Sequence, residues 1–324
     1  MADTGAKAAA PALRSCPLCG SNDLRPWRPG EPLVLQCHSC GSGWVAAPPP
    51  QDVIDSLYQE AYYQEGTGAR FMGFAEWALV ALKKLRYRAI AARVPGPGTI
   101  LDVGCGRGDL LLVFHDQGWR VLGTQLSRTA AEAARKTWGL DVLVGDLPAL
   151  ELPRASFDVI TFFHVLEHLP DPALHLREAF ACLKDKGLLV VEVPNFRTLG
   201  FGFLGRRHLC YDSPHHLIFF SPRGLKALLA ACGFREESRS FFSLEYGPFT
   251  LLQNWLNVLP GEPNRLYRAL KGDPTGRSLR IHPLTWIHIG LGILLSLPAL
   301  LFSLTGLCFP VGNTLRVYCR KATI

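Results

Sequence analysis

The stretch that most constrains the fold is Thr99–Asp109, TILDVGCGRGD. An extended apolar run ends in Asp102, and glycines follow at every second position, at Gly104, Gly106 and Gly108, before an apolar run typical of a helix. Glycine permits positive φ and close backbone approach, and a helix N-terminus presents free N–H groups. The stretch therefore predicts a strand, a tight turn and a helix that bind a nucleotide-like cofactor. The G-x-G-x-G spacing differs from the G-x-G-x-x-G of dinucleotide-binding folds.

From Thr99 onward, strand-like apolar runs alternate with segments of helical pattern. This alternation predicts an α/β fold with a doubly wound, mostly parallel sheet and helices on both faces. Two later runs, at 235–242 and 314–320, are also strand-like. The first five strands are expected at 99–103, 120–124, 141–144, 157–163 and 188–193.

Two C-x-x-C knuckles stand near the N-terminus, with 17 residues between them. This spacing is typical of zinc sites in which each knuckle places two sulfurs on a tight turn. Four thiolates complete a tetrahedral site with no open position, so we expect structural zinc bound by Cys16, Cys19, Cys37 and Cys40. A ribbon without metal and a redox pair are the alternatives, and His38 is expected to be a bystander.

Composition and patterning suggest how the chain is divided. The net charge of +7 suits anionic lipids, nucleotide-sugars and RNA alike. No apolar segment near the N-terminus is long enough for a signal peptide, so we expect a cytoplasmic chain with reduced thiols.

We expect a disordered tail at 1–14, a zinc ribbon at 15–46, a helical linker or cap at 51–96, a core at 97–243, a hydrophobic helical insertion at 244–312 and the last core strand at 313–324.

Several motifs together resemble the class I S-adenosylmethionine-dependent methyltransferases. They are LDVGCGRG at 101–108, VLGTQLS at 121–127, GD at 145–146, FDVITFFHVLEHLPDP at 157–172 and LKDKGLLVVEVPN at 183–195. A further segment, DSPHHLIFFSPRGLKALLAACGF at 212–234, is similar to the branch of sugar, polysaccharide and quinone pathways, which often has an N-terminal zinc ribbon. The resemblance implies a Rossmann-like methyltransferase fold and S-adenosylmethionine as cofactor. It also implies a seven-stranded sheet in which the last strand, at 314–320, returns antiparallel beside the strand at 235–242.

The resemblance also implies which residues hold the cofactor. The three glycines of the turn would approach its methionine part, and Asp102 would lie near its ammonium group. Asp146, with Leu147, would face the adenine. The implied cofactor-binding set is Asp102, Gly104, Gly106, Gly108, Gln125, Asp146 and Leu147.

Gln125 departs from the family pattern, which has Asp or Glu at the end of the second strand to bind both ribose hydroxyls. An amide still accepts one hydroxyl proton and donates to another oxygen, but it loses the charge-assisted part of the bond, worth about 1 kcal/mol. We expect weaker cofactor binding. A non-catalytic membrane scaffold with this fold is the alternative.

A group of histidines follows the fourth strand. His164, Glu167 and His168 stand at i, i+3 and i+4, which places them on one face of a helical turn, and His215 and His216 come from a later loop. Three interpretations remain open. His164 or one of the later pair is a general base, or a divalent metal is bound by His164, Glu167, His168 and one of the later pair, or Glu167 and His168 are structural. The candidate catalytic residues are His164, Glu167, His215 and His216.

A glycine- and aromatic-rich loop at 196–209 contains Arg206 and Arg207. We consider two interpretations of it: a lid over the acceptor whose arginines contact phosphate, and a flexible surface loop.

The segment from Pro283 to Leu315 contains no Asp, Glu, Lys or Arg. Its apolar part, 284–307, is long enough to span a bilayer, but Pro298 near its middle favours two shorter helices or a kink. A single crossing would also place the last strand on the wrong side of the membrane. We therefore expect a re-entrant or interfacial helical hairpin that contacts a membrane through 283–311. A buried cap or dimer interface and a true span are the alternatives.

These features predict a methyltransferase that acts on a small-molecule or lipid-linked acceptor of glycan or quinone type, at the cytoplasmic face of a membrane. An RNA methyltransferase is the alternative among enzymes. Nucleic acid is not the expected partner, since no run of Lys and Arg interleaves with aromatic residues in the ribbon or the sheet.

Overall fold

The computed structural model describes residues 15–29, 32–48, 73–212, 215–270, 279 and 281–322, with the backbone alone at 73–81. The expected tail at 1–14 and much of the expected linker, at 51–72, lie outside the described residues. The boundaries expected for the six segments remain predictions.

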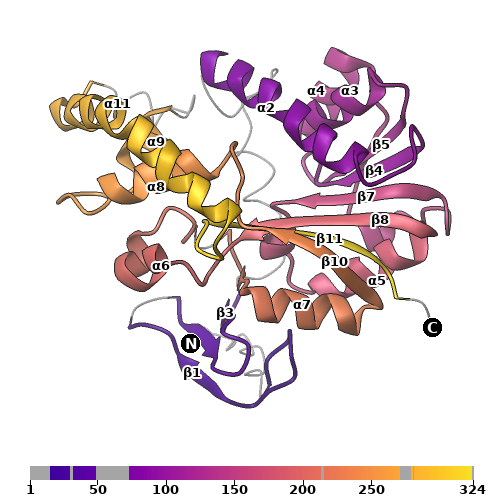
Figure 1. Cartoon of the computed structure of the whole chain (residues 1–324), viewed down its shortest axis with the longest axis horizontal. Helices are drawn as coiled ribbons and strands as arrows, with labels where there is room; N and C mark the ends of the chain where they lie inside the picture. Colours follow the sequence, from indigo (N-terminus) through magenta and orange to yellow (C-terminus); the bar gives the residue numbers. More distant parts are fainter. Residues whose placement is uncertain are drawn as a thin grey trace, which may run out of the picture.

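A seven-stranded sheet forms the centre of the molecule, in the order β10-β11-β8-β7-β4-β5-β6 (Figure 1). Neighbouring strands from β8 to β6 run parallel, and β11 is antiparallel to both β8 and β10. The predicted doubly wound sheet and the antiparallel return of its last strand are therefore confirmed. The strands are β4 (Thr99–Val103), β5 (Arg120–Gln125), β6 (Val142–Val144), β7 (Phe157–Phe163), β8 (Leu183–Pro194), β10 (Phe234–Ser240) and β11 (Thr314–Lys321).

Helices cover both faces of this sheet, because its strands present apolar side chains in both directions. Ile100 packs against the face that carries α2 (Gly73–Ala91), α3 (Asp109–His115) and α4 (Arg128–Trp138). Its neighbour Leu101 packs against the opposite face, with α5 (Pro172–Cys182) and α7 (Pro222–Ala231). Successive residues of a strand point to opposite sides, so each strand contributes to two separate cores.

The N-terminal ribbon is joined to the core by a shared sheet. Its strands β1 (Leu24–Pro26), β2 (Val34–Cys37) and β3 (Gly43–Val45) continue into β9 (Ile218–Phe219), which comes from the core. The hydroxyl of Ser221 donates to the Cys40 carbonyl at 2.5 Å, and the Ser221 N–H donates to Oγ of Ser42 at 2.9 Å. A Cβ at Gly224 would lie 2.1 Å from that same Oγ, so the close contact requires glycine.

The insertion before the last strand is helical, with α8 (Gly247–Leu256), α9 (Arg265–Leu270), α11 (Pro283–Ser303) and the short turn η4 (Leu304–Leu307). The expectation of two shorter helices at Pro298 is wrong, since α11 continues through it. A small core of Leu252, Leu256, Leu266 and Ala299 joins α11 to α8 and α9. Pro283–Leu307 is long and apolar enough to cross a membrane, with mean hydropathy 2.1, and 22% of this stretch's most apolar part is buried.

Candidate functional site

The glycine turn after β4 adopts a backbone that only glycine accommodates well. Gly104, Gly106 and Gly108 have φ values of 68°, 59° and 80°. A Cβ at Gly104 would lie 2.6 Å from Cγ2 of Val165, and one at Gly108 would lie 2.6 Å from Cδ1 of Leu140. Side chains at these positions would therefore strain the backbone and force the neighbours to move. The turn leaves exposed backbone beside the start of α3, as a cofactor cradle requires.

Asp102 lies at the end of β4, directly before this turn, and is 4% exposed. Thr161 donates its hydroxyl hydrogen to Oδ1 of Asp102 at 2.6 Å. Burial raises the pKa of the Asp102 carboxyl to about 6. No cationic side chain of the described residues hydrogen-bonds this carboxylate. A ligand ammonium group at the turn would therefore interact with a buried carboxylate that no described cationic side chain hydrogen-bonds.

The ends of β5 and β6 lie beside the same turn. Oε1 of Gln125 accepts the N–H groups of Leu126 and Ser127, at 2.8 and 3.4 Å, so this amide is turned toward its own backbone. Oδ1 of Asp146 lies 2.6 Å from Nε2 of His175. Leu147 as a whole is only 1% exposed, so it offers almost no surface to a ligand. The structure thus brings the predicted residues to neighbouring strand ends, and their role as cofactor contacts stays a prediction.

His164 begins the histidine group after β7, with a left-handed backbone (φ 57°). Its Nδ1 lies 3.1 Å from Oε1 of Glu167, and its Nε2 lies 3.2 Å from Oε1 of Glu192. Burial alone would lower the His164 pKa, but hydrogen bonds and charge interactions with the two carboxylates raise it to about 9. Both ring nitrogens therefore carry protons at neutral pH. This charge state disfavours His164 as the general base.

Glu192 connects His164 to a buried ion-pair network that was not anticipated. Arg86 donates to Oε1 of Glu192 at 2.9 Å, and Arg316 donates to Oε2 at 2.5 Å. Nε of Arg86 also lies 3.0 Å from Oε2 of Glu245. One clue was present in the sequence, because Glu192 is the only charged residue in the apolar run of 188–193. A charge in a buried strand needs partners.

A second group contains Glu167, His168 and His216, whose ligand atoms lie within 4.8 Å of one another. Nδ1 of His168 lies 2.9 Å from the His215 carbonyl, and Nδ1 of His216 lies 2.8 Å from the Cys210 carbonyl. Because a carbonyl only accepts, both Nδ1 atoms are donors, so in the neutral rings the lone pair is on Nε2. Burial and the nearby His216 lower the His168 pKa to about 4, so His168 is neutral at pH 7.

The grouping agrees in part with the predicted metal set of His164, Glu167, His168 and one of His215 and His216. Glu167, His168 and His216 lie together, but His164 is not in the group, because its nitrogens bond two carboxylates. Oε2 of Glu167 is buried and has no hydrogen-bond partner among the described residues. His215 is directed elsewhere, with Nδ1 3.4 Å from Oδ1 of Asp212.

Comparison with known proteins identifies the fold family. Residues 74–238, just over half of the chain, match a family of methyltransferase domains. The chain is a class I S-adenosylmethionine-dependent methyltransferase.

Curated relatives of the methyltransferase match its central part. A probable S-adenosylmethionine-dependent methyltransferase of Mycolicibacterium smegmatis is 33% identical over 152 residues, covering 47% of this chain and 57% of the relative. A ubiquinone biosynthesis O-methyltransferase of Xanthomonas campestris is 32% identical over 164 residues, covering 47% of this chain and 69% of the relative. A 2-methyl-6-phytyl-1,4-hydroquinone methyltransferase of Synechocystis is 32% identical over 153 residues, covering 44% of this chain and 48% of the relative. A solved methyltransferase from Archaeoglobus fulgidus aligns with a TM-score of 0.48 at 20% identity, over 78% of this chain and 96% of that one.

The residues present fit S-adenosylmethionine. When bound, this cofactor supplies a methyl group on a sulfonium, which is already activated for displacement. The glycine turn would admit its methionine part, and the buried carboxylate of Asp102 would bind its ammonium group. The protein's main contribution to an in-line displacement is then to orient the acceptor and exclude water.

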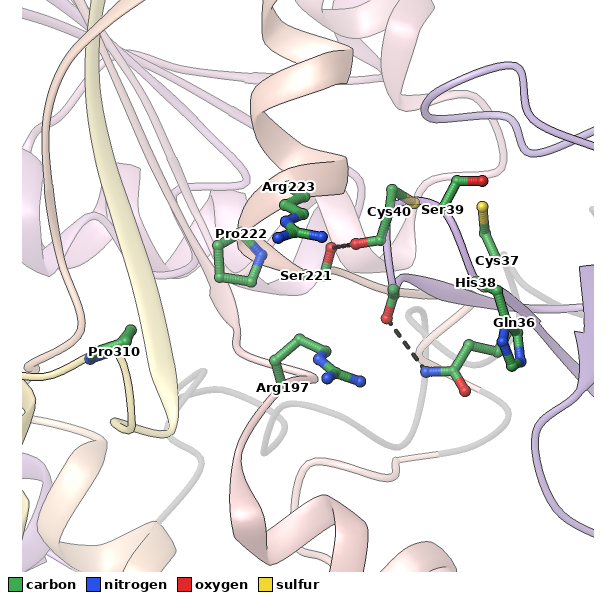
Figure 2. A pocket seen from close by; sticks show the side chains of 11 residues that line it. Gln36, Cys37, His38, Ser39, Cys40, Arg197, Ser221, Pro222, Arg223 and Pro310 are labelled. Atoms are coloured by element: carbon green, nitrogen blue, oxygen red, sulfur yellow. Dashed lines mark hydrogen bonds between the residues drawn. The ribbon is translucent and has the colours of Figure 1, made fainter. Parts of the chain in front are cut away.

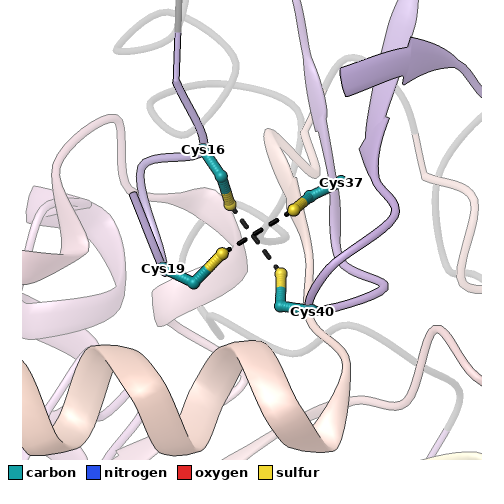
Figure 3. Close-up of side chains that lie close together, drawn as sticks. All are labelled: Cys16, Cys19, Cys37 and Cys40. Atoms are coloured by element: carbon teal, nitrogen blue, oxygen red, sulfur yellow. Dashed lines mark hydrogen bonds between the residues drawn. The ribbon is translucent and has the colours of Figure 1, made fainter. Parts of the chain in front are cut away.

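The four cysteines of the ribbon fit a tetrahedral zinc site (Figure 3). Sγ of Cys16 lies 3.8 Å from Sγ of Cys40, and Sγ of Cys19 lies 3.7 Å from Sγ of Cys37. A tetrahedron with Zn–S bonds of about 2.3 Å has S–S edges of about 3.8 Å. A hydrogen bond from the Cys16 thiol lowers the pKa of Cys40 to about 5, which favours one thiolate before metal binds. Zinc binding stays a prediction, with a donor set and geometry that suit it.

Arg206 and Arg207 do not serve the predicted phosphate contact. Arg206 donates to the carbonyls of Pro29 and Pro32, at 3.2 and 3.0 Å. Arg207 donates to the carbonyls of Asn257 and Leu259, at 2.9 and 2.8 Å. These bonds tie the loop after α6 (Leu199–Leu204) to the ribbon and to the insertion. Both arginines are structural links in the methyltransferase.

Proposed function

We propose that the methyltransferase methylates a small-molecule acceptor that is lipid-linked, of quinone or glycan type, while docked at the cytoplasmic face of a membrane. The observation that carries this proposal is the exposed apolar face of α11. Relatives named for ubiquinone biosynthesis and for a phytyl hydroquinone support an apolar acceptor of this kind.

The exposed face of α11 is formed by residues spaced along one side of the helix. Their side chains are between 55 and 72% exposed: Trp286, Ile287, Ile293, Leu294, Leu297 and Leu301. The opposite side packs against α8 and α9. A surface of this size and composition is unfavourable in water and suits the boundary between lipid headgroups and acyl chains.

The topology favours a helix that lies in the interface over one that crosses the membrane. The insertion leaves the sheet after β10 and returns to it as β11, and these two strands pair with each other. Both ends of the insertion therefore lie on the same side of any membrane that α11 touches. The helix docks one soluble domain on the lipid surface.

Glu167, His168 and His216 form the acceptor-facing chemical group in this proposal. His168 is neutral at pH 7, as a proton acceptor must be. The same three side chains suit a divalent ion, which would lower the pKa of an acceptor hydroxyl instead. Chelation separates the two roles when metal analysis shows that the ribbon keeps its zinc: methyl transfer by the intact protein then continues in EDTA if His168 is the base, and stops reversibly if an ion is required. In this proposal His164 positions the group through its bond to Glu167, and Glu192 holds His164 in place.

Liposome flotation tests the membrane contact. The full chain is expected to float with vesicles, and Ile293→Glu/Leu297→Glu is expected to remain in the soluble fraction. Leu174→Glu is the matched control, because Leu174 is 44% exposed on α5, outside the insertion. Flotation of the double variant at the level of the full chain would overturn membrane docking through α11.

Acceptor class is tested by incubating the full chain with tritiated S-adenosylmethionine and with lipid and glycan extracts, then locating the labelled product by mass spectrometry. The expected product partitions into the organic phase. Label found only in water-soluble products would contradict a lipid-linked acceptor.

A further inference from the structure

A basic cavity lies between the zinc ribbon and the core (Figure 2). It has a volume of about 540 Å³, which is within the range of small-molecule sites. Arg197 and Arg223 line it from the core, and Gln36 and His38 line it from the ribbon. None of the 11 residues shown lining it is Asp or Glu, and two of them, Cys37 and Cys40, belong to the four-cysteine cluster. The positive charge of the cavity comes from Arg197 and Arg223, which are the side chains that an anion would contact.

The two arginines of this cavity differ from their neighbours in having no partner. Among the described residues, neither the Arg197 nor the Arg223 guanidinium forms a hydrogen bond or an ion pair. Arg206 and Arg207, on the same loop as Arg197, are bound to backbone carbonyls. Both side chains are exposed and line a concave site, so their guanidinium groups are free to bind the oxygens of a phosphate group in bidentate fashion.

An apolar cavity of about 350 Å³ lies between α6, α8 and the end of α11. Its outer rim is made of exposed apolar side chains, with Leu199 at 83%, Phe203 at 76% and Phe302 at 54%. Polar side chains occur among the remaining lining residues, such as Ser243 and Asn254. The rim is continuous with the exposed face of α11, since Phe302 follows Leu301.

The two cavities adjoin along two stretches of chain. Arg197 lines the basic cavity, and the next residues, Thr198 and Leu199, line the apolar one. Pro310 lines the basic cavity, and Val311 after it lines the apolar one. Consecutive Cα atoms are about 3.8 Å apart, so the two cavities are neighbours at both places.

The apolar cavity also lies next to the histidine group. Ser243 and Gly247 line it, and between them in the chain Tyr246 places its ring 4.2 Å from the ring of His164. The segment that lines the apolar cavity therefore also contacts His164, the first residue of the histidine group.

We propose that the two cavities together bind one phosphate-bearing lipid, with its phosphate between Arg197 and Arg223 and its acyl or isoprenoid chain in the apolar cavity. The chain passes over Phe203 and Phe302 toward the exposed face of α11. This assignment rests on the proposed function, since it names the class of lipid that the docked enzyme accepts. A lipid bound in this way would contact the ribbon, the core and the insertion at the same time.

Calorimetry on the full chain, without S-adenosylmethionine, tests the assignment with three probes: farnesyl monophosphate, farnesol and inorganic phosphate. Farnesyl monophosphate is expected to bind most tightly. Arg197→Gln/Arg223→Gln is expected to weaken it at least about tenfold and to leave farnesol unchanged. Arg177→Gln/Arg235→Gln removes the same charge from exposed positions outside the cavity and is expected to have no effect.

Phe203→Ala probes the chain site and is expected to weaken farnesol and farnesyl monophosphate alike, by about threefold. Because Phe203 is 76% exposed, this variant keeps the fold, and unchanged thermal unfolding verifies it. The assignment is overturned if farnesol and farnesyl monophosphate bind equally, if inorganic phosphate alone binds as tightly, or if the control pair weakens binding as much.

The outcome is separable from that of the proposed function. Farnesyl monophosphate binding without methyl transfer to any lipid would overturn the proposed function and leave the lipid site standing. Methyl transfer to a lipid-linked acceptor without farnesyl monophosphate binding would overturn this assignment alone.

Discussion

Nε2 of His164 lies 3.2 Å from Oε1 of Glu192, a carboxylate that is fully buried between Arg86 and Arg316. The arginines keep Glu192 ionised, and its pKa lies well below the usual value despite burial. Glu192 in turn favours the charged form of His164. His164 is therefore a cation at neutral pH, and the neutral His168 is the group in this cluster that is able to accept a proton.

The first prediction concerns the titration of His164. Its pKa is expected near 9 in the native protein, and Glu167→Gln is expected to lower it by about one unit or more, because the bond to Glu167 is lost. The raised pKa stabilises the fold fully below the unfolded value of about 6.5, and this contribution is lost as pH rises through about 9. Histidine NMR titration and pH-dependent unfolding measure both effects. A His164 pKa near 6.5 in the native protein would contradict the charge assignment.

The second prediction concerns cofactor binding and pH. Burial raises the pKa of Asp102 to about 6, and the cofactor's ammonium group is expected to bind the ionised carboxylate. Calorimetry is expected to show a dissociation constant for S-adenosylmethionine that is steady between pH 6 and about pH 7.5, where the cofactor's amino group is still protonated, and that rises about tenfold per pH unit below pH 6. Asp102→Asn is expected to bind weakly at every pH and to remove this slope. An unchanged slope in Asp102→Asn would assign the proton to another group.

The third prediction concerns Gln125. A Glu at this position can still accept the backbone N–H groups of Leu126 and Ser127, and it adds a charge toward the ribose hydroxyls. Gln125→Glu is therefore expected to tighten S-adenosylmethionine binding about fivefold to tenfold, as one charge-assisted hydrogen bond allows. Gln125→Ala serves as the comparison and is expected to weaken binding. If the native protein, Gln125→Glu and Gln125→Ala all fail to bind the cofactor in calorimetry, the result supports the alternative of a non-catalytic scaffold.

Features with a local pattern could be predicted from the sequence. The strand ends at Asp102 and Asp146 follow apolar runs, and the cysteine pairs have the spacing of a metal site. The strand pattern at 314–320 is likewise local, whereas the antiparallel orientation of β11 was implied by the resemblance to the family. These features depend on neighbours in the chain, which a sequence shows directly.

Other features depend on contacts between distant residues. The strand β9 has two residues, Ile218–Phe219, and no local pattern indicates that it joins the ribbon. Arg197 and Arg207 are alike in the sequence, and only the carbonyls around Arg207 show which of them is already bound. The insertion was expected to divide at Pro298, but packing on α8 and α9 supports one continuous α11.

The fourth prediction concerns the zinc ribbon. Cys16, Cys37 and Cys40 are buried in the same core as residues of β7, β8 and α7, and β3 pairs with β9. Loss of the metal is therefore expected to destabilise the core as well as the ribbon. Cys16→Ser is expected to lose about one zinc per chain and to lower the free energy of unfolding by more than about 4 kcal/mol. Metal analysis and thermal unfolding measure the two effects.

Cys308→Ser is the control for the fourth prediction, because Cys308 is exposed and outside the cluster. It is expected to keep both zinc and stability. If Cys16→Ser loses its metal but unfolds at the same temperature as the native protein, the ribbon holds zinc without supporting the core. In that case β3–β9 pairing and the Ser42–Ser221 hydrogen bonds would be sufficient to hold the ribbon in place.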